Sequence, residues 1–202
     1  MFDDYLRKLK DRLLAPIARR LGPGVSPNLL TWLALVVGLA SAGAALTHRY
    51  WLGLALWFVN RILDGLDGTQ ARVHDRGTAF GAYLDIVLDF VVYAAIPSAL
   101  ALADGSFAAA MAACLLLASF YVNAASWMYL SALLEQREKG ARATGEITAV
   151  TMPRGLVAGT ETVVGYALFF LLPARLPEVF ALMAILVLAT VGQRLVWAKR
   201  VL

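Results

Sequence analysis

The sequence contains a single cysteine, Cys114, and this residue lies inside an apolar run. One thiol can build neither a disulfide framework nor a thiolate zinc site, so both are excluded. The first twenty residues hold no long apolar core and no small-residue cleavage site, so we do not expect a cleavable signal peptide. Internal repeats and low-complexity tracts are also lacking. The simplest expectation is one domain over residues 1–202.

Charged residues are scarce, at 16% of the 202 residues, whereas 60% are hydrophobic and the mean hydropathy is +0.70. Apolar runs near the length of a bilayer-spanning helix recur along the chain, which indicates an all-α integral membrane protein with several spans. Apolar length and breaker residues predict six transmembrane helices. They are expected over about 28–46, 51–72, 78–103, 107–134, 153–172 and 177–197.

Lys and Arg are distributed unequally between the two sides of this predicted bundle. Fifteen of the eighteen fall in the N-terminal arm, the loops after the second and fourth helices, and the C-terminal end. Cytoplasmic flanks accumulate Lys and Arg, so both termini are predicted to be cytoplasmic. Topology and lipid attraction explain the net charge of +4, and nothing in the pattern indicates nucleic-acid binding.

Residues 1–22 form a juxtamembrane arm with apolar side chains at helical spacing and Lys or Arg between them. The apolar positions are Phe2, Tyr5, Leu6, Leu9, Leu13 and Ile17. This pattern is typical of an amphipathic helix that lies on anionic membrane lipids. A basic flank that only directs topology explains the charges equally well, and the sequence leaves both readings open.

Four aspartates interrupt this apolar sequence, and an ionised carboxylate in a membrane helix is costly unless something compensates it. Asp64 and Asp67 lie at i and i+3, and Ala71 continues the same helical face. Asp85 and Asp89 lie at i and i+4 on the next predicted helix. Two helices joined by a short turn are antiparallel. The four carboxylates are therefore predicted to converge near the cytosolic boundary.

Such a cluster must be protonated, paired with Arg or occupied by cations, because unpaired carboxylates repel each other at low dielectric. Hard oxygen ligands suit Mg²⁺ or Mn²⁺ better than zinc, and two such ions would neutralise all four charges and clamp a diphosphate. Gly68 and Gly81 remove side chains where a nucleotide or a helix must approach closely. Arg72 offers a bidentate cation for phosphate oxygens. Taken singly, each glycine is explained more simply by helix packing, and Arg72 by a charge that directs membrane topology.

The pattern Asp64-x-x-Asp67-Gly68-x-x-Ala71-Arg72, followed after eight residues by Gly81-x-x-x-Asp85-x-x-x-Asp89, resembles the signature of the CDP-alcohol phosphotransferase family at every fixed position. The resemblance implies six spanning helices with cytosolic termini and a homodimer. It also implies that an alcohol hydroxyl attacks a CDP-linked donor and releases CMP, and we expect this donor to be CDP-diacylglycerol.

By this resemblance the site residues take three roles. The implied metal ligands are Asp64, Asp67, Asp85 and Asp89, and the implied catalytic residues are Asp85 and Asp89, with Asp89 as a second-metal ligand or as the base. The implied CDP-binding residues are Asp64, Gly68, Ala71, Arg72 and Gly81. A carboxylate that ligates a metal is a poor proton acceptor, so the two roles of Asp89 compete.

The acceptor is the least determined part of the prediction. Family members that use a phosphorylated acceptor usually carry a Gly-Lys-x-Lys-Thr-like stretch, and here no lysine occurs between Lys139 and Lys199. Glu161, expected about eight residues inside the fifth helix, is an acceptor or proton-transfer candidate, or else a structural ion-pair partner. Candidate acceptor residues are Glu161, Arg154, Arg137 and Arg142. The segment GLVAGTET loosely resembles the choline and ethanolamine phosphotransferase branch, in which diacylglycerol accepts.

Two further classes stay open as alternatives. Membrane prenyltransferases also hold a diphosphate through magnesium and two acidic helix motifs, which Asn60, Asp64, Asp85 and Asp89 partly mimic, but they lack the Asp-Gly-x-x-Ala-Arg unit. A divalent-cation transporter would use buried acids but would not require Arg72 beside them, since a fixed cation opposes ion entry.

Overall fold

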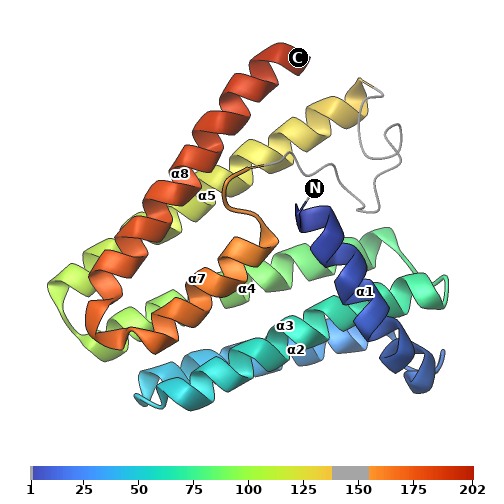
Figure 1. Ribbon diagram of the computed structural model, residues 1–202, viewed down its shortest axis with the longest axis horizontal. Coiled ribbons are helices and arrows are strands. Elements are labelled where there is room, and N and C mark those ends of the chain that lie inside the picture. Colours follow the sequence, from blue (N-terminus) through green and yellow to red (C-terminus); the bar gives the residue numbers. More distant parts are fainter. Residues whose placement is uncertain (1, 138–154) are drawn as a thin grey trace. The chain divides into compact units, whose positions relative to one another are not determined.

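The structure is a computed structural model, and it describes the backbone of residues 2–137 and 155–202 and the side chains of residues 10, 12–137 and 155–202. Its helices are α1 (Phe2–Leu21), α2 (Pro27–Leu46), α3 (Tyr50–Val73), α4 (Ala79–Asp104), α5 (Phe107–Gln136), α7 (Gly159–Leu171), the 3₁₀ helix η1 (Pro173–Arg175) and α8 (Leu176–Val201) (Figure 1). This part of the chain contains no strand, so the all-α prediction is confirmed.

The described residues form two compact units. The first consists of residues 2–106 and 166–174 and contains all four aspartates of the predicted site. The second consists of residues 107–137, 155–165 and 175–202, in which α5 packs against α8. The single domain predicted for residues 1–202 stays a prediction.

Local sequence signals explain where the helices of the first unit begin and end. Pro27 stands at the start of α2, where its missing N–H costs nothing, and Ser26 before it is extended. The hydroxyl of Thr78 accepts a hydrogen bond of 2.9 Å from the backbone N–H of Gly81, which caps α4. Gly105 ends α4 in the left-handed conformation, with φ of +72°. Since α3 ends at Val73 and Thr78 caps the start of α4, the turn between these helices is short, over residues 74–78.

Within the first unit, α2 packs against both α3 and α4. Gly38 makes this close approach possible, because a Cβ atom there would lie 2.5 Å from a methyl group of Val92 on α4. Gly53 on α3 similarly faces the ring of Phe170, at 2.4 Å from an added Cβ. Small residues let helix backbones approach in a membrane, where packing rather than water exclusion drives helix association.

The helix α1 packs against α3 through one of its faces. Leu14 and Ala18 are buried against Leu30 and Leu66. Leu13 and Ile17 lie on another face, with exposed fractions of 65% and 45%. The predicted N-terminal helix is thus present, and Leu13 and Ile17 remain available to contact lipid. Its interfacial role stays a prediction.

Four helices of the described chain are long and apolar enough to cross a membrane: α2, α4, α5 and the segment Pro173–Val201. The predicted second span forms α3, a helix of 24 residues that carries the charged residues of the site. The predicted fifth span appears as the shorter apolar helix α7, which begins at Gly159 rather than near residue 153. The described residues thus contain four candidate spans, and the count of six stays a prediction.

Candidate functional site

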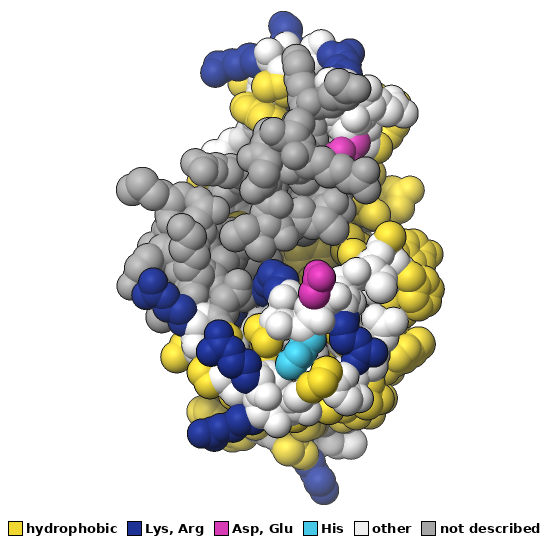
Figure 2. Space-filling model, turned by 90° about the vertical axis from the view of Figure 1, so that its right-hand side faces the viewer, with side chains coloured by type: hydrophobic (Ala, Val, Ile, Leu, Met, Phe, Trp, Pro, Cys, Tyr) yellow, Lys and Arg dark blue, Asp and Glu magenta, His cyan; other side chains and the backbone are white. Residues whose placement is uncertain are grey.

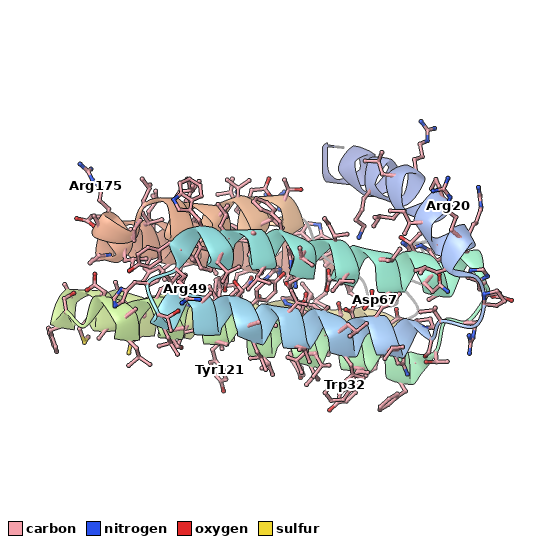
Figure 3. All side chains as sticks on the ribbon, turned by 90° about the horizontal axis from the view of Figure 1, so that it is seen from below. Arg20, Trp32, Arg49, Asp67, Tyr121 and Arg175 are labelled. Atoms are coloured by element: carbon pink, nitrogen blue, oxygen red, sulfur yellow. The ribbon has the colours of Figure 1, made fainter. Side chains whose placement is uncertain are left out.

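The four aspartates project from the adjacent ends of α3 and α4, next to the start of α2. Asp67 is buried, and its Oδ2 atom accepts a hydrogen bond of 2.7 Å from the hydroxyl of Thr31 on α2. Figure 3 shows Asp67 between α3 and α2, whereas Trp32, the next residue on α2, points outward. A third helix, α2, therefore contributes to the site beside the two acidic helices. The sequence pattern did not indicate this contribution.

A cavity of about 10 Å³ lies between α2, α3 and α4. Its lining includes three of the four aspartates, Asp64, Asp85 and Asp89, together with Thr31 and Asn60. This volume is close to the minimum that holds one water molecule, so the cavity has the scale of small ions rather than of a whole substrate. Asp67 lies beside it, through its hydrogen bond with Thr31.

Arg61 of α3 forms a close ion pair in this region. Its Nη2 atom lies 2.6 Å from Oδ1 of Asp89, and its Nη1 atom donates to Oδ2 of the same carboxylate at 3.2 Å. Nη1 also lies 3.6 Å from Oδ2 of Asp64, one helical turn along α3. The two parallel contacts with Asp89 have the bidentate geometry that makes Arg–carboxylate pairs strong and directional.

Sequence reasoning missed Arg61 and Thr31 as members of this site. For Arg61 a signal existed, because it precedes Asp64 by three residues and thus shares its helical face. Thr31 gave no local signal, since it follows the apolar start of another helix and reaches Asp67 across 36 residues of sequence.

The four aspartates offer oxygen donors alone, the donor set that Mg²⁺ and Mn²⁺ prefer. Three of them face one cavity of ionic scale, so their chemistry and placement fit a divalent ion. In the described part of the chain, however, no three His, Cys, Asp or Glu side chains are already gathered tightly enough to coordinate a metal. Arg61 instead forms ion pairs with Asp89 and Asp64. To bind a metal, these carboxylates would have to contact the ion in addition to Arg61 or in place of it.

Of the predicted CDP-binding residues, Gly81 has a structural reason to lack a side chain. A Cβ there would lie 3.0 Å from Oδ1 of Asn28 at the start of α2, so Gly81 permits close contact of α4 with α2. At Gly68 an added Cβ would lie 3.3 Å from the guanidinium of Arg72. Ala71 is half-buried and Arg72 is exposed. At Gly77, by contrast, an added Cβ would meet nothing within 4 Å among the described residues.

Figure 2 shows several exposed Lys and Arg side chains on the face that it draws. Near the turns that carry the acids, the exposed residues Arg19, Arg20, Arg72 and Arg76 all belong to the first unit. Cytoplasmic flanks of membrane helices carry an excess of Lys and Arg, so these four arginines agree with the predicted cytosolic side.

The predicted acceptor residues belong to a different part of the structure. Glu161 and Arg137 lie in the second unit, and both are exposed. The predicted depth of Glu161 is wrong: it occupies the first turn of α7, where its carboxylate accepts a hydrogen bond of 3.1 Å from the backbone N–H of Ala158. An acid at this position stabilises a helix N-terminus, which explains Glu161 without an acceptor. Arg142 and Arg154 lie outside the described residues.

Comparison with known proteins identifies the group to which this site belongs. Residues 24–201 match the profile of CDP-alcohol phosphatidyltransferase. The chain belongs to the CDP-alcohol phosphatidyltransferase family. The predicted family is thus confirmed, and the chain is a transferase of phospholipid biosynthesis. Membership of this family argues against the prenyltransferase and transporter alternatives.

Among CDP-alcohol phosphatidyltransferase relatives, the chain is 32% identical over 175 residues to the inner membrane protein YnjF of Escherichia coli, covering 86% of this chain and 84% of YnjF. It is 43% identical over 96 residues to the bifunctional IPC transferase and DIPP synthase of Aquifex aeolicus, covering 48% of this chain and 22% of that protein. It is 35% identical over 74 residues to the CDP-diacylglycerol–serine O-phosphatidyltransferase of Mycobacterium tuberculosis, covering 37% of this chain and 26% of that enzyme.

The fold resembles that of phosphatidylinositol phosphate synthase from Mycobacterium tuberculosis. With CDP-DAG bound, that protein aligns with a TM-score of 0.71 at 23% identity, covering 93% of this chain and 94% of the other. The same protein in complex with manganese and citrate aligns with a TM-score of 0.68 at 23% identity, covering 92% and 88%. A likeness at this identity shows that the CDP-alcohol phosphatidyltransferase fold is shared.

Proposed function

We propose that this protein transfers a phosphatidyl group from a CDP-linked donor, CDP-diacylglycerol, to the hydroxyl of an alcohol, in a reaction that depends on a divalent metal. The observation that carries the proposal is the cavity whose lining includes Asp64, Asp85 and Asp89. These residues belong to the motif on which the family resemblance depends. CDP-DAG bound to a protein of the same fold supports the choice of donor.

Asp64, Asp67, Asp85 and Asp89 would hold Mg²⁺ or Mn²⁺, and two ions match their four negative charges. Bound there, the metal supplies positive charge for the diphosphate of the donor and for the leaving phosphate oxygen. Manganese in a protein of the same fold supports this choice of cofactor. Thr31 fixes the Asp67 carboxylate in one orientation, because it donates a hydrogen bond to one of its oxygens.

The donor's CDP group would lie along the face that carries Gly68, Ala71 and Arg72, with Gly81 across from it on α4. Arg72 is exposed and offers a guanidinium to phosphate oxygens. The acceptor oxygen forms a bond to the phosphorus beside the diacylglycerol moiety, and the phosphorus–oxygen bond to CMP breaks. The hydroxyl proton passes to Asp89 or Asp85, and CMP leaves with the electron pair of the broken bond.

We place this chemistry at the cytosolic face, where CDP-linked donors and soluble alcohols meet the membrane. The basic residues around the turns of the first unit support this side. The choline and ethanolamine branch is the second candidate, and its support is the loose resemblance of the segment GLVAGTET, in which Glu161 caps its own helix. Arg137 stays an acceptor candidate, and serine, inositol, inositol phosphate and glycerol 3-phosphate are the alcohols to compare.

The test is release of CMP by the purified protein in lipid with Mn²⁺. CDP-diacylglycerol is crossed with those four alcohols, and CDP-choline and CDP-ethanolamine are crossed with diacylglycerol. We expect acceptor-dependent CMP release with CDP-diacylglycerol and one alcohol. Release with CDP-choline or CDP-ethanolamine alone would overturn the choice of donor, and silence in every pairing by folded protein would overturn the reaction.

Asp67→Asn and Asp85→Asn provide the matched test of the metal site. Each change keeps the size of the side chain and removes one negative charge, so we expect CMP release to fall by about a hundredfold or more. The measurement is the initial rate of CMP release, with the gel-filtration profile and the helical circular dichroism signal as controls for folding. Near-normal rates in both variants would contradict the metal assignment.

A further inference from the structure

Arg61 is a largely buried cation in the middle of α3, and the proposed reaction assigns it no role. Only 10% of its side chain is exposed. Its two terminal nitrogens contact both oxygens of Asp89, at 2.6 and 3.2 Å, and one of them approaches Asp64 to 3.6 Å. The guanidinium therefore occupies a position beside two of the carboxylates that would hold a metal.

Groups other than carboxylates hold the guanidinium from its remaining sides. Its Nε atom donates to Oδ1 of Asn60 at 2.8 Å, and Nη1 donates to the hydroxyl of Tyr93 at 2.9 Å. The ring of Trp57 lies 4.7 Å from the central carbon of the guanidinium, and the ring of Tyr93 lies 5.2 Å away. A cation over these aromatic faces gains further attraction where water is excluded. Arg61 is thus fixed from several directions.

These supporting side chains are themselves anchored. Asn60 donates from Nδ2 to the backbone carbonyl of Ala34 at 2.7 Å. Tyr166 donates its hydroxyl to the backbone carbonyl of Tyr93 at 2.6 Å and stacks on Trp57 with 4.7 Å between ring centres. An arginine held in this way cannot follow Asp89 freely if that carboxylate turns. The geometry fits a permanent cation at this point of the site.

A fixed cation here has two opposite electrostatic effects. It offsets part of the charge of the four carboxylates and thereby stabilises the fold when no metal is bound. It also repels a divalent ion that enters the same cavity, and thereby weakens its binding. Pairing with Arg61 does not prevent Asp89 from ligating, because a carboxylate has about four lone-pair positions and the guanidinium uses two.

We propose that Arg61 is a positioning residue that acts as the built-in counter-cation of the acidic site: it orients Asp89, stabilises the site without metal, and lowers its affinity for divalent ions. The proposal rests on the proposed function in one respect, namely that these aspartates bind a divalent metal. A merely structural ion pair would lower stability when removed, but it would not tighten metal binding.

The experiment compares the wild-type protein with Arg61→Gln and Arg61→Lys in detergent. Arg49→Gln is the matched control, because Arg49 is an exposed arginine that precedes the same helix and contacts no acid of the site. Two quantities are measured: the midpoint of thermal unfolding with EDTA, and the dissociation constant for Mn²⁺ from the electron paramagnetic resonance signal of free Mn²⁺. Neither requires turnover.

For Arg61→Gln we expect the metal-free midpoint to fall by about 5 °C or more, since the carboxylates lose their buried partner. We expect its Mn²⁺ dissociation constant to fall by about threefold or more, since the repelling charge is gone. Arg61→Lys keeps the charge but not the bidentate contact, so its midpoint should fall while its Mn²⁺ affinity stays near that of the wild type. Arg49→Gln should change neither quantity.

Unchanged or weaker Mn²⁺ binding by Arg61→Gln would overturn the proposal. If that variant does not fold, a wild-type midpoint in Arg61→Lys would overturn it instead, because the bidentate contact would then contribute nothing. The proposed function is scored separately by CMP release from the wild type. Silence there, with tighter Mn²⁺ binding in Arg61→Gln, would reject the reaction and leave the role of Arg61 in place.

Discussion

At the scale of single residues, the acids of this site are positioned by neighbours that carry no negative charge. Thr31 donates to Asp67, and the backbone N–H of Gly68 donates to the other oxygen of the same carboxylate. Arg61 contacts both oxygens of Asp89. Each partner limits how its carboxylate can rotate. The loss of a partner that orients a metal ligand typically lowers metal affinity or activity by about 10- to 100-fold.

Thr31 allows a test of this positioning without any change in charge. Thr31→Val is nearly isosteric and removes the hydroxyl, so Asp67 loses a buried hydrogen bond. We expect CMP release to fall by about tenfold and the free energy of unfolding to fall by about 1 kcal/mol. The initial rate and a thermal unfolding curve measure the two effects. Thr31→Ser keeps the hydroxyl and should retain most of the rate; equal losses in both variants would contradict the argument.

At the scale of helices, close approach of α2 to α3 and α4 brings the acids and their partners together. Gly38 lies at the α2–α4 contact, whereas Gly43 on the same helix has open space around it. The same substitution at both glycines changes helix propensity in the same way, but only at position 38 does it also change packing. Comparing the two variants therefore separates the effect of packing from that of helix propensity.

Gly38→Ala and Gly43→Ala should therefore change stability in opposite directions. The added methyl at position 38 meets Val92 at 2.5 Å, and we expect a loss of about 1–3 kcal/mol from overpacking. The methyl at position 43 meets nothing, and Ala is favoured over Gly inside a helix by about 0.5–1 kcal/mol. Thermal unfolding in detergent compares them. Equal stabilisation by both changes would show that the α2–α4 contact is looser than described.

The helix α1 shows how one predicted element acquires two roles. Its described apolar residues divide between a face that packs on α3, with Leu14 and Ala18, and a face that stays exposed, with Leu13 and Ile17. The periodicity predicted one apolar stripe for contact with lipid. Leu14 and Ala18 were not part of that stripe, and they dock the helix because Leu30 and Leu66 offer an apolar surface there.

At the scale of the whole molecule, the unequal distribution of Lys and Arg predicts which turns face the cytosol. The turn between α2 and α3 contains Thr47, and the turn between α3 and α4 contains Gly77, both exposed. Since these turns lie at opposite ends of α3, they should lie on opposite sides of the membrane. The homodimer implied by the family resemblance also stays a prediction at this scale.

Single cysteines at positions 47 and 77, introduced after Cys114→Ala, test this orientation in intact cells. A membrane-impermeant maleimide added outside should label Thr47→Cys at once and Gly77→Cys only after the membrane is opened. The reason is that the acidic site near Gly77 needs a cytosolic supply of substrate. Labelling of Gly77→Cys from outside, with protection of Thr47→Cys, would reverse the topology and move the proposed chemistry to the other side.

Sequence alone was sufficient for the membrane class, most helix positions and the acidic motif. Long apolar runs are visible without a structure, because the bilayer thickness sets their length. The predicted helices over 51–72, 78–103, 107–134 and 177–197 differ from α3, α4, α5 and α8 by four residues or fewer at each end. The aspartates were recognisable because a charge in an apolar helix is costly and their spacing is fixed.

Tertiary structure alone decided what surrounds those acids. Thr31 reaches Asp67 from another helix, and Tyr93 and Asn60 enclose Arg61, contacts that depend on how closely α2, α3 and α4 pack. Helical spacing specifies which residues share a face, but not which face of a distant helix will oppose it. The predicted depth of Glu161 was wrong for a related reason: apolar composition did not reveal that α7 begins at Gly159, where a carboxylate caps the helix.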